Sequence, residues 1–77
     1  MNKTIVITGA TGALGNKAAH AFAGRGHSLA LLDNDQSKLD ALTRELHLPA
    51  DRFFASVIDL RDGNALRATA QAVAAKF

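Results

Sequence analysis

The chain has 77 residues, which is enough for one small domain, and 48% of them are apolar, so a disordered chain is excluded. Its net charge is +2 and its basic residues are scattered, which argues against a nucleic-acid-binding stripe or a polybasic membrane segment. Without Cys it has no disulfide framework and no thiolate metal site, so a cytoplasmic setting is expected. The apolar run at residues 5–7 is too short for a signal-peptide core or a membrane span.

The first strand–helix unit is predicted at the start of the chain. Residues 4–8 are a β-branched run that ends at glycine, which indicates a buried parallel strand. Leu14, Ala18 and Phe22 recur at four-residue spacing and predict the core-facing side of a helix over residues 14–23.

Two further strand–helix units follow. Residues 28–32 predict a second strand, and the leucine spacing after them predicts a helix over residues 36–46. Residues 53–58 predict a third strand, and Asp62 precedes the last helix. The apolar face of that helix is expected to hold Leu66, Ala70, Val73 and Phe77.

This alternation predicts the fold class. Three strand–helix units with short connections imply right-handed crossovers and a parallel sheet. We expect an α/β, three-layer, Rossmann-like half in which three parallel strands, in the order 3-2-1, alternate with three helices. Residues 1–77 would then be a single, partial domain of this fold.

The expected strand order leaves the first strand at an edge of the sheet. A bare β-branched edge is a template for pairing with another chain. A two-fold axis along the strands would give a homodimer with the order 3-2-1-1′-2′-3′. The alternative is that the last helix shields this edge, within one chain or by swapping into a neighbour.

Three glycines at three-residue spacing join the first strand to the first helix. Gly9 lets the chain leave the strand sharply, Gly12 lets a pyrophosphate approach the backbone, and Gly15 lets the helix pack closely on the sheet. The N–H groups at the helix start favour an anion. The alternative is a turn that uses glycine for geometry alone. The Gly-Lys-Ser/Thr sequence of a phosphate-loop NTPase does not occur.

An acidic residue, Asp33, lies 18 residues beyond Gly15, after the second predicted strand. An acid at about this distance bonds the ribose hydroxyls of a dinucleotide. Because a carboxylate also repels a 2′-phosphate, Asp33 predicts a preference for NAD over NADP. Asp33 could instead cap the second helix, although Asn34 and Asp35 are equally placed for capping.

Residues 8–15, Thr-Gly-Ala-Thr-Gly-Ala-Leu-Gly, resemble the cofactor loop of the short-chain dehydrogenase/reductase family. Their spacing is similar to that of its extended and atypical members, whereas residues 31–33 and 57–60 are similar to its compact members. The resemblance implies that Asp59 bonds the adenine amino group and that Leu60 lines the adenine pocket. The full implied NAD site is Gly9, Thr11, Gly12, Ala13, Leu14, Gly15, Asp33, Asn34, Asp59 and Leu60.

The family's catalytic Ser and its Tyr-x-x-x-Lys pair have no counterpart here, since the 77 residues contain no Tyr. The resemblance therefore implies the truncated N-terminal module of an oxidoreductase, which binds the ADP part of NAD and is catalytically inactive alone. Two alternatives are an active enzyme completed by a longer or complementing chain, and a self-assembling Rossmann half without a ligand. The three His residues lack metal-ligand spacing, and Arg61 and Arg67 are expected on a solvated helix face.

Overall fold

The computed structural model describes residues 3–59 and 61–77 of the chain. Within them the elements follow in the order β1 (Thr4–Thr8), α1 (Ala13–Gly24), β2 (Ser28–Asp33), α2 (Gln36–Leu46), a 3-10 turn (Ala50–Arg52), β3 (Phe53–Val57) and α3 (Gly63–Lys76). The alternation of strands and helices confirms the predicted fold class. The bounds of β1 and α2 are as predicted. Those of β2 and β3 differ from the prediction by one residue at the carboxyl end, and α1 is one residue longer at each end.

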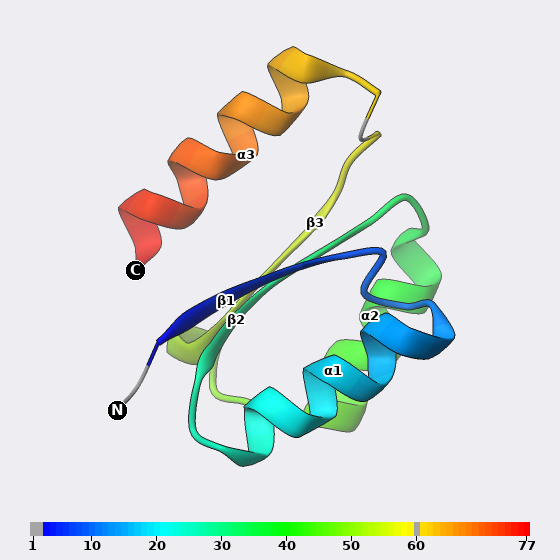
Figure 1. The fold of residues 1–77 in the computed structure, drawn as a ribbon, viewed down its shortest axis with the longest axis vertical. Helices are drawn as coiled ribbons and strands as arrows, with labels where there is room; N and C mark the ends of the chain where they lie inside the picture. Colours follow the sequence, from blue (N-terminus) through cyan, green and yellow to red (C-terminus); the bar gives the residue numbers. More distant parts are fainter. Residues whose placement is uncertain (1–2, 60) are drawn as a thin grey trace.

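The described strands form one parallel sheet in the order β1-β2-β3, which is the predicted order read from the other edge. The Cα atom of Val6 in β1 pairs with that of Ala30 in β2, which pairs in turn with Phe54 in β3. Helices α1 and α2 cover one face of the sheet and α3 lies on the opposite face (Figure 1). The carboxyl ends of all three strands consequently lie along the same edge of the sheet.

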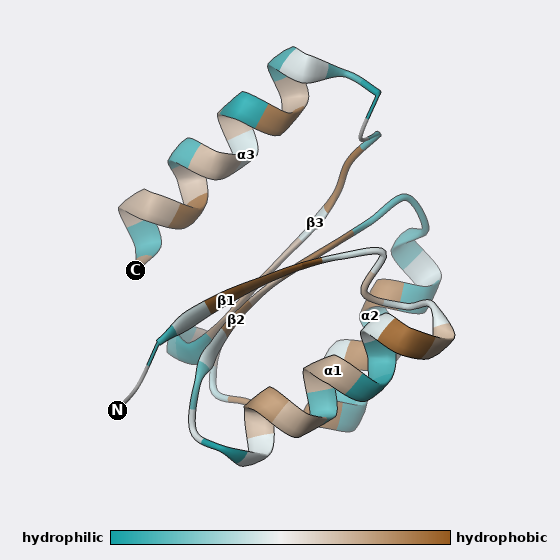
Figure 2. Ribbon diagram, viewed as in Figure 1, coloured by the Kyte–Doolittle hydropathy of each residue, from teal (hydrophilic) through white to brown (hydrophobic). Residues whose placement is uncertain are grey.

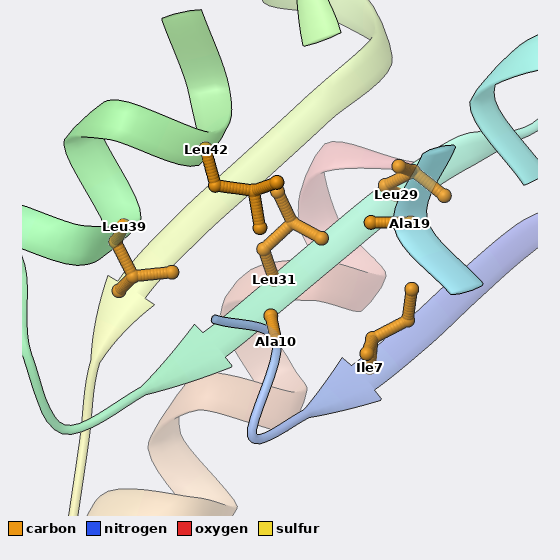
Figure 3. Packing of buried hydrophobic residues seen from close by; sticks show 7 residues of the cluster. All are labelled: Ile7, Ala10, Ala19, Leu29, Leu31, Leu39 and Leu42. Atoms are coloured by element: carbon orange, nitrogen blue, oxygen red, sulfur yellow. The ribbon is translucent and has the colours of Figure 1, made fainter. Parts of the chain in front are cut away.

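The core is centred on β2, the middle strand. Because successive side chains of a strand point to opposite faces, Leu29 and Leu31 point toward α1 and α2. Both leucines are fully buried there against Ala19, Leu39 and Leu42, as Figure 3 shows. The strand is buried on both faces, which explains why its sequence is a continuous apolar run rather than an alternating one. Figure 2 shows this apolar centre in brown along β1 and β2.

The opposite face of the sheet is covered more thinly. Val73 of α3 is buried, and the ammonium group of Lys76 donates to the carbonyl oxygen of Ala50 at 2.7 Å. Leu66 and Phe77 each remain 39% exposed. The predicted apolar face of α3 is therefore only partly buried against the sheet.

The first turn of α1 departs from the prediction. Ala18 and Phe22 pack against the core as expected, but the side chain of Leu14 is 83% exposed. This turn lies beside β1, the edge strand, so no described element covers that side of the helix. Leu14 instead borders an open apolar hollow of about 600 Å³ that it shares with Ile5 and Phe22.

The contrast between two leucines gives a test of this core. Leu31→Ala should lower the free energy of unfolding by about 2–5 kcal/mol, because it removes a fully buried side chain and leaves a cavity. Leu14→Ala, the same change at an exposed position, should alter it by less than about 0.5 kcal/mol. Urea unfolding followed by circular dichroism measures both. Equal losses in the two variants would contradict the assignment of Leu14 to the surface.

Candidate functional site

The glycine turn begins with a backbone conformation that favours glycine. Gly9 has φ of 63°, in the left-handed region, directly after β1. Its carbonyl oxygen accepts a hydrogen bond from the backbone N–H of Gly12 at 3.0 Å, which closes the turn. The next N–H in the chain, that of Ala10, donates to the carbonyl oxygen of Leu32 at 3.1 Å and fastens the turn to β2.

Gly15 is required by a close approach within this turn. A Cβ atom at Gly15 would overlap the carbonyl oxygen of Gly9 and lie 3.0 Å from the Cα of Ala10. The close packing predicted for Gly15 is thus present, but its partner is the turn that leaves the strand rather than the sheet itself. A Cβ at Gly12 would lie 3.4 Å from the same Gly9 oxygen, so the turn has room for a small side chain there.

The start of α1 differs from the starts of the other two described α-helices. Asp35 accepts from the N–H of Lys38 and caps α2, and Asp62 accepts from two N–H groups and caps α3. Gly12 is the N-cap of α1 and offers no side chain, and the first turn of α1 holds no acidic residue. The N–H groups at this helix start are therefore available to an anionic ligand, which the helix dipole also favours.

Asp33 is fastened to the glycine turn. Its Oδ2 accepts from the N–H of Thr11 at 3.0 Å and from the hydroxyl of Thr11 at 2.7 Å, and its Oδ1 accepts from the N–H of Asn34 at 2.7 Å. The Thr11 hydroxyl in particular lowers the pKa of Asp33 below its ordinary value, with partial burial opposing that effect. Because Asp35 caps α2, the alternative role of Asp33 as a helix cap is wrong.

Asp59 is paired with a neighbour that sequence reasoning placed wrongly. Arg61 donates from Nε to Oδ1 at 3.0 Å and from Nη2 to Oδ2 at 2.9 Å, so the pair is bidentate. This pairing lowers the pKa of Asp59 and raises that of Arg61. Arg61 lies before α3 rather than on its solvated face, because Asp62 caps the helix and holds Arg61 outside it. The sequence signal that could have identified this ion pair is the Asp-x-Arg spacing directly after the predicted third strand.

Two hollows meet at Gly9. The first, of about 370 Å³, is lined by Gly9, Asp33, Asn34, Ile58, Asp59 and Arg61. The second is the apolar hollow beside β1, and Gly9, Gly12, Ala13, Leu14 and Gly15 contribute to its lining. The structure thus brings Asp33, Asn34 and Asp59 together on one side of Gly9 and the start of α1 on the other. Thr11 lines neither hollow, and Leu60 lies outside the described residues.

In residues 3–59 and 61–77, no three His, Asp or Glu side chains are grouped so that they could hold a metal ion. Over the same residues, no helix has the length and apolar content needed to cross a membrane.

A parallel sheet with helices on both faces, and a glycine turn at the carboxyl end of its first strand, defines the N-terminal half of a Rossmann-type fold. The sequence profile of the short chain dehydrogenase family matches residues 3–77. The chain belongs to this family.

Individual relatives agree with this assignment. A very-long-chain 3-oxoacyl-CoA reductase of Neurospora crassa is 50% identical over 48 residues, which are 62% of this chain and 14% of that protein. A crystal structure from Brucella melitensis, described as a short-chain dehydrogenase/reductase of the glucose/ribitol dehydrogenase type, has 31% identity and a TM-score of 0.91 over 97% of this chain and 32% of its own. A Burkholderia phymatum short-chain dehydrogenase/reductase in complex with NAD has 29% identity and a TM-score of 0.89 over 99% of this chain and 27% of its own. The chain spans a third or less of the length of these proteins.

The glycine turn gives a test with an internal control. Gly15→Ala should lower the free energy of unfolding by roughly 1–3 kcal/mol, because the added Cβ forces α1 away from the turn. Gly24→Ala adds the same atom to the last residue of the same helix, where nothing lies within 4 Å of it. It should be neutral or stabilise by up to about 1 kcal/mol, since alanine restricts the unfolded chain. A Gly15→Ala variant as stable as Gly24→Ala would refute the close approach.

Proposed function

We propose that the chain is the NAD-binding N-terminal module of a short-chain dehydrogenase/reductase and that it holds the ADP part of the dinucleotide. The observation that carries this proposal is the position of Gly9 between two hollows, with an uncapped helix start on one side and the carboxylates of Asp33 and Asp59 on the other. An ADP group has matching parts in the same order: its phosphates would meet the helix start, and the hydrogen-bond donors of its ribose and adenine would meet the carboxylates. The complex of the Burkholderia phymatum relative with NAD supports the choice of ligand.

Each part of the site is proposed to bind one part of the ligand. The N–H groups of Ala13 and Leu14 face the pyrophosphate, and Gly12 keeps that approach clear of side chains. Gly9 and Gly15 maintain the turn. Asp33 accepts from the ribose, and Asn34 lies beside it in the lining of the hollow.

Asp59 is proposed to accept from the adenine amino group, with Leu60 as its neighbour in the adenine pocket. Arg61 fills both acceptor positions of Oδ1 through its backbone N–H and Nε but only one position of Oδ2 through Nη2, so one position on Oδ2 is left for the adenine amino group. The side chain of Arg61 is 92% exposed, and an ion pair this open to water is worth little. The pairing of Asp59 with Arg61 is therefore compatible with adenine binding.

Hydride transfer is proposed only for a protein that contains more than these residues. A bound nicotinamide dinucleotide would supply the hydride donor or acceptor. The resemblance to this family implies that proton transfer needs a Tyr, and the 77 residues contain none. The contribution of this chain is therefore to bind and orient the cofactor. The remaining groups of an NAD-dependent oxidoreductase would come from a longer or complementing chain.

Cofactor choice is the first test of this proposal. The chain should bind NAD more tightly than NADP in calorimetric titrations, because the Asp33 carboxylate accepts from the ribose 2′-hydroxyl and repels a 2′-phosphate. Asp33→Ala should weaken NAD binding roughly tenfold, as expected for loss of a hydrogen bond to a charged group, and should narrow the difference from NADP.

The matched control is Asp51→Ala, which removes an exposed carboxylate from the 3-10 turn before β3, at the opposite edge of the sheet. It should leave both affinities unchanged. Tighter binding of NADP than of NAD by the unmodified chain would overturn the cofactor assignment. Binding of neither dinucleotide by a folded chain would favour the ligand-free, self-assembling alternative.

We also propose that the chain forms a homodimer through the edge of β1. Val6 is 55% exposed on this strand. The edge lies between the apolar hollow beside α1 and a second apolar groove of about 400 Å³, which Val6 and Leu32 share with Leu66 and Val73 of α3. Because the Val6 side chain is exposed, we propose that α3 leaves this part of the edge open to a second copy of the chain. Pairing of two β1 strands would cover apolar surface on both faces of the sheet.

Sedimentation equilibrium over a wide concentration range tests the dimer. The unmodified chain should sediment as a dimer, and Val6→Lys should shift it to a monomer by placing a charge in the proposed interface. Val57→Lys is the matched control, since Val57 is 44% exposed on β3, the other edge strand of the sheet. A folded monomer at high micromolar concentration, or dissociation caused equally by both variants, would contradict pairing through β1.

A further inference from the structure

Thr11 joins two parts of the site that lie far apart in the sequence. It stands within the glycine turn, 22 positions before Asp33, and gives that residue two hydrogen bonds. Both end on the same carboxylate atom, Oδ2, and both donors, the backbone N–H and the hydroxyl, belong to Thr11. The position of the Asp33 carboxylate is thereby fixed relative to the turn.

These contacts decide which atom of Asp33 is left for a ligand. An ionised carboxylate has about four acceptor positions, two on each oxygen. Oδ2 uses both of its positions on Thr11, whereas Oδ1 uses one on the N–H of Asn34. These hydrogen bonds leave one acceptor position, on Oδ1, and the backbone N–H of Asp35 also lies near the carboxylate. Because Asp33 lines the 370 Å³ hollow and Thr11 does not, Thr11 acts on the ligand only through Asp33.

We infer that Thr11 is a positioning residue that sets the cofactor preference of this chain, by holding Oδ2 of Asp33 so that Oδ1 is the single acceptor offered to the ribose. This inference rests on the proposed function and deepens it. A carboxylate held in one orientation binds a ribose hydroxyl without a further loss of side-chain freedom. It also cannot turn away from a 2′-phosphate, so the repulsion of NADP is retained. Without the Thr11 hydroxyl, the backbone N–H groups of Thr11 and Asn34 still hold Asp33, but Oδ2 gains an open acceptor position and the carboxylate is held less firmly.

Thr11→Val is the variant that tests the inference, because it removes the hydroxyl at nearly constant volume and keeps the N–H. Affinity for NAD should fall, but by less than the roughly tenfold expected for Asp33→Ala, because the carboxylate that contacts the ligand stays in place, while affinity for NADP falls less or rises. Thr11→Ser, which restores a hydroxyl, should recover the NAD preference of the unmodified chain. Thr43→Val is the matched control, since its hydroxyl donates to the carbonyl oxygen of Asp40 on α2, away from the site.

The pH dependence of NAD binding gives a second readout. The Thr11 hydroxyl lowers the pKa of Asp33, so the carboxylate of the unmodified chain stays ionised as the pH falls. In Thr11→Val that pKa returns toward its ordinary value, and NAD binding should be lost at a higher pH. The other charged groups lining the hollow are Asp59 and Arg61, which pair with each other and are unchanged in the variant.

The possible results separate this inference from the function on which it rests. A folded Thr11→Val variant whose affinities for NAD and NADP are unchanged, or fall by the same factor, would show a structural role only and overturn the inference. If Thr11→Val does not fold, Thr11→Ala gives the same comparison. If the unmodified chain binds neither dinucleotide, the proposed function fails. NMR titration of the Asp33 carboxyl then decides the positioning role, because equal pKa values with and without the hydroxyl would refute it.

Discussion

The carbonyl oxygen of Gly9 is the point on which the rest of the structure depends. It accepts the hydrogen bond that closes the turn after β1, and it lies so close to Gly15 that α1 has no room for a side chain there. That contact sets the distance of α1 from the sheet and hence the packing of Ala19 and Phe22 on the core. The same turn supplies Gly12 as the N-cap of α1, and because Gly12 has no side chain the N–H groups at the helix start stay uncapped.

The features that sequence could predict are those that local chemistry dictates. The β-branched run of β1 and the continuous apolar run of β2 identify buried parallel strands, and the glycine spacing identifies the turn between β1 and α1. The separation between Gly15 and Asp33 predicts that Asp33 lies at the end of β2, and the structure has it there. Each of these predictions needs only the period of one element and the chemistry of the residues that end it.

The features that sequence could not predict depend on which segments meet in space. The hydrogen bonds from Thr11 to Asp33 connect two turns that come together only because β1 and β2 are paired. Leu14 follows the helical period of the core face and yet is exposed, because periodicity gives a direction and not the extent of the sheet beneath it. Arg61 was missed as a partner of Asp59 because its role depends on where α3 begins.

The direction of the strands separates the ends of the chain from the glycine turn. The N–H of Ser28, at the amino end of β2, donates to the carbonyl oxygen of Lys3, and Lys76 donates to the carbonyl oxygen of Ala50 just before β3. Residues 3 and 76 therefore lie along the amino edge of the sheet (Figure 1). The glycine turn and Asp33 lie at the carboxyl edge of the sheet. A tether attached at either end therefore leaves the carboxyl edge facing solution. This geometry makes the chain suitable for surface immobilisation or for genetic fusion to a carrier at either terminus.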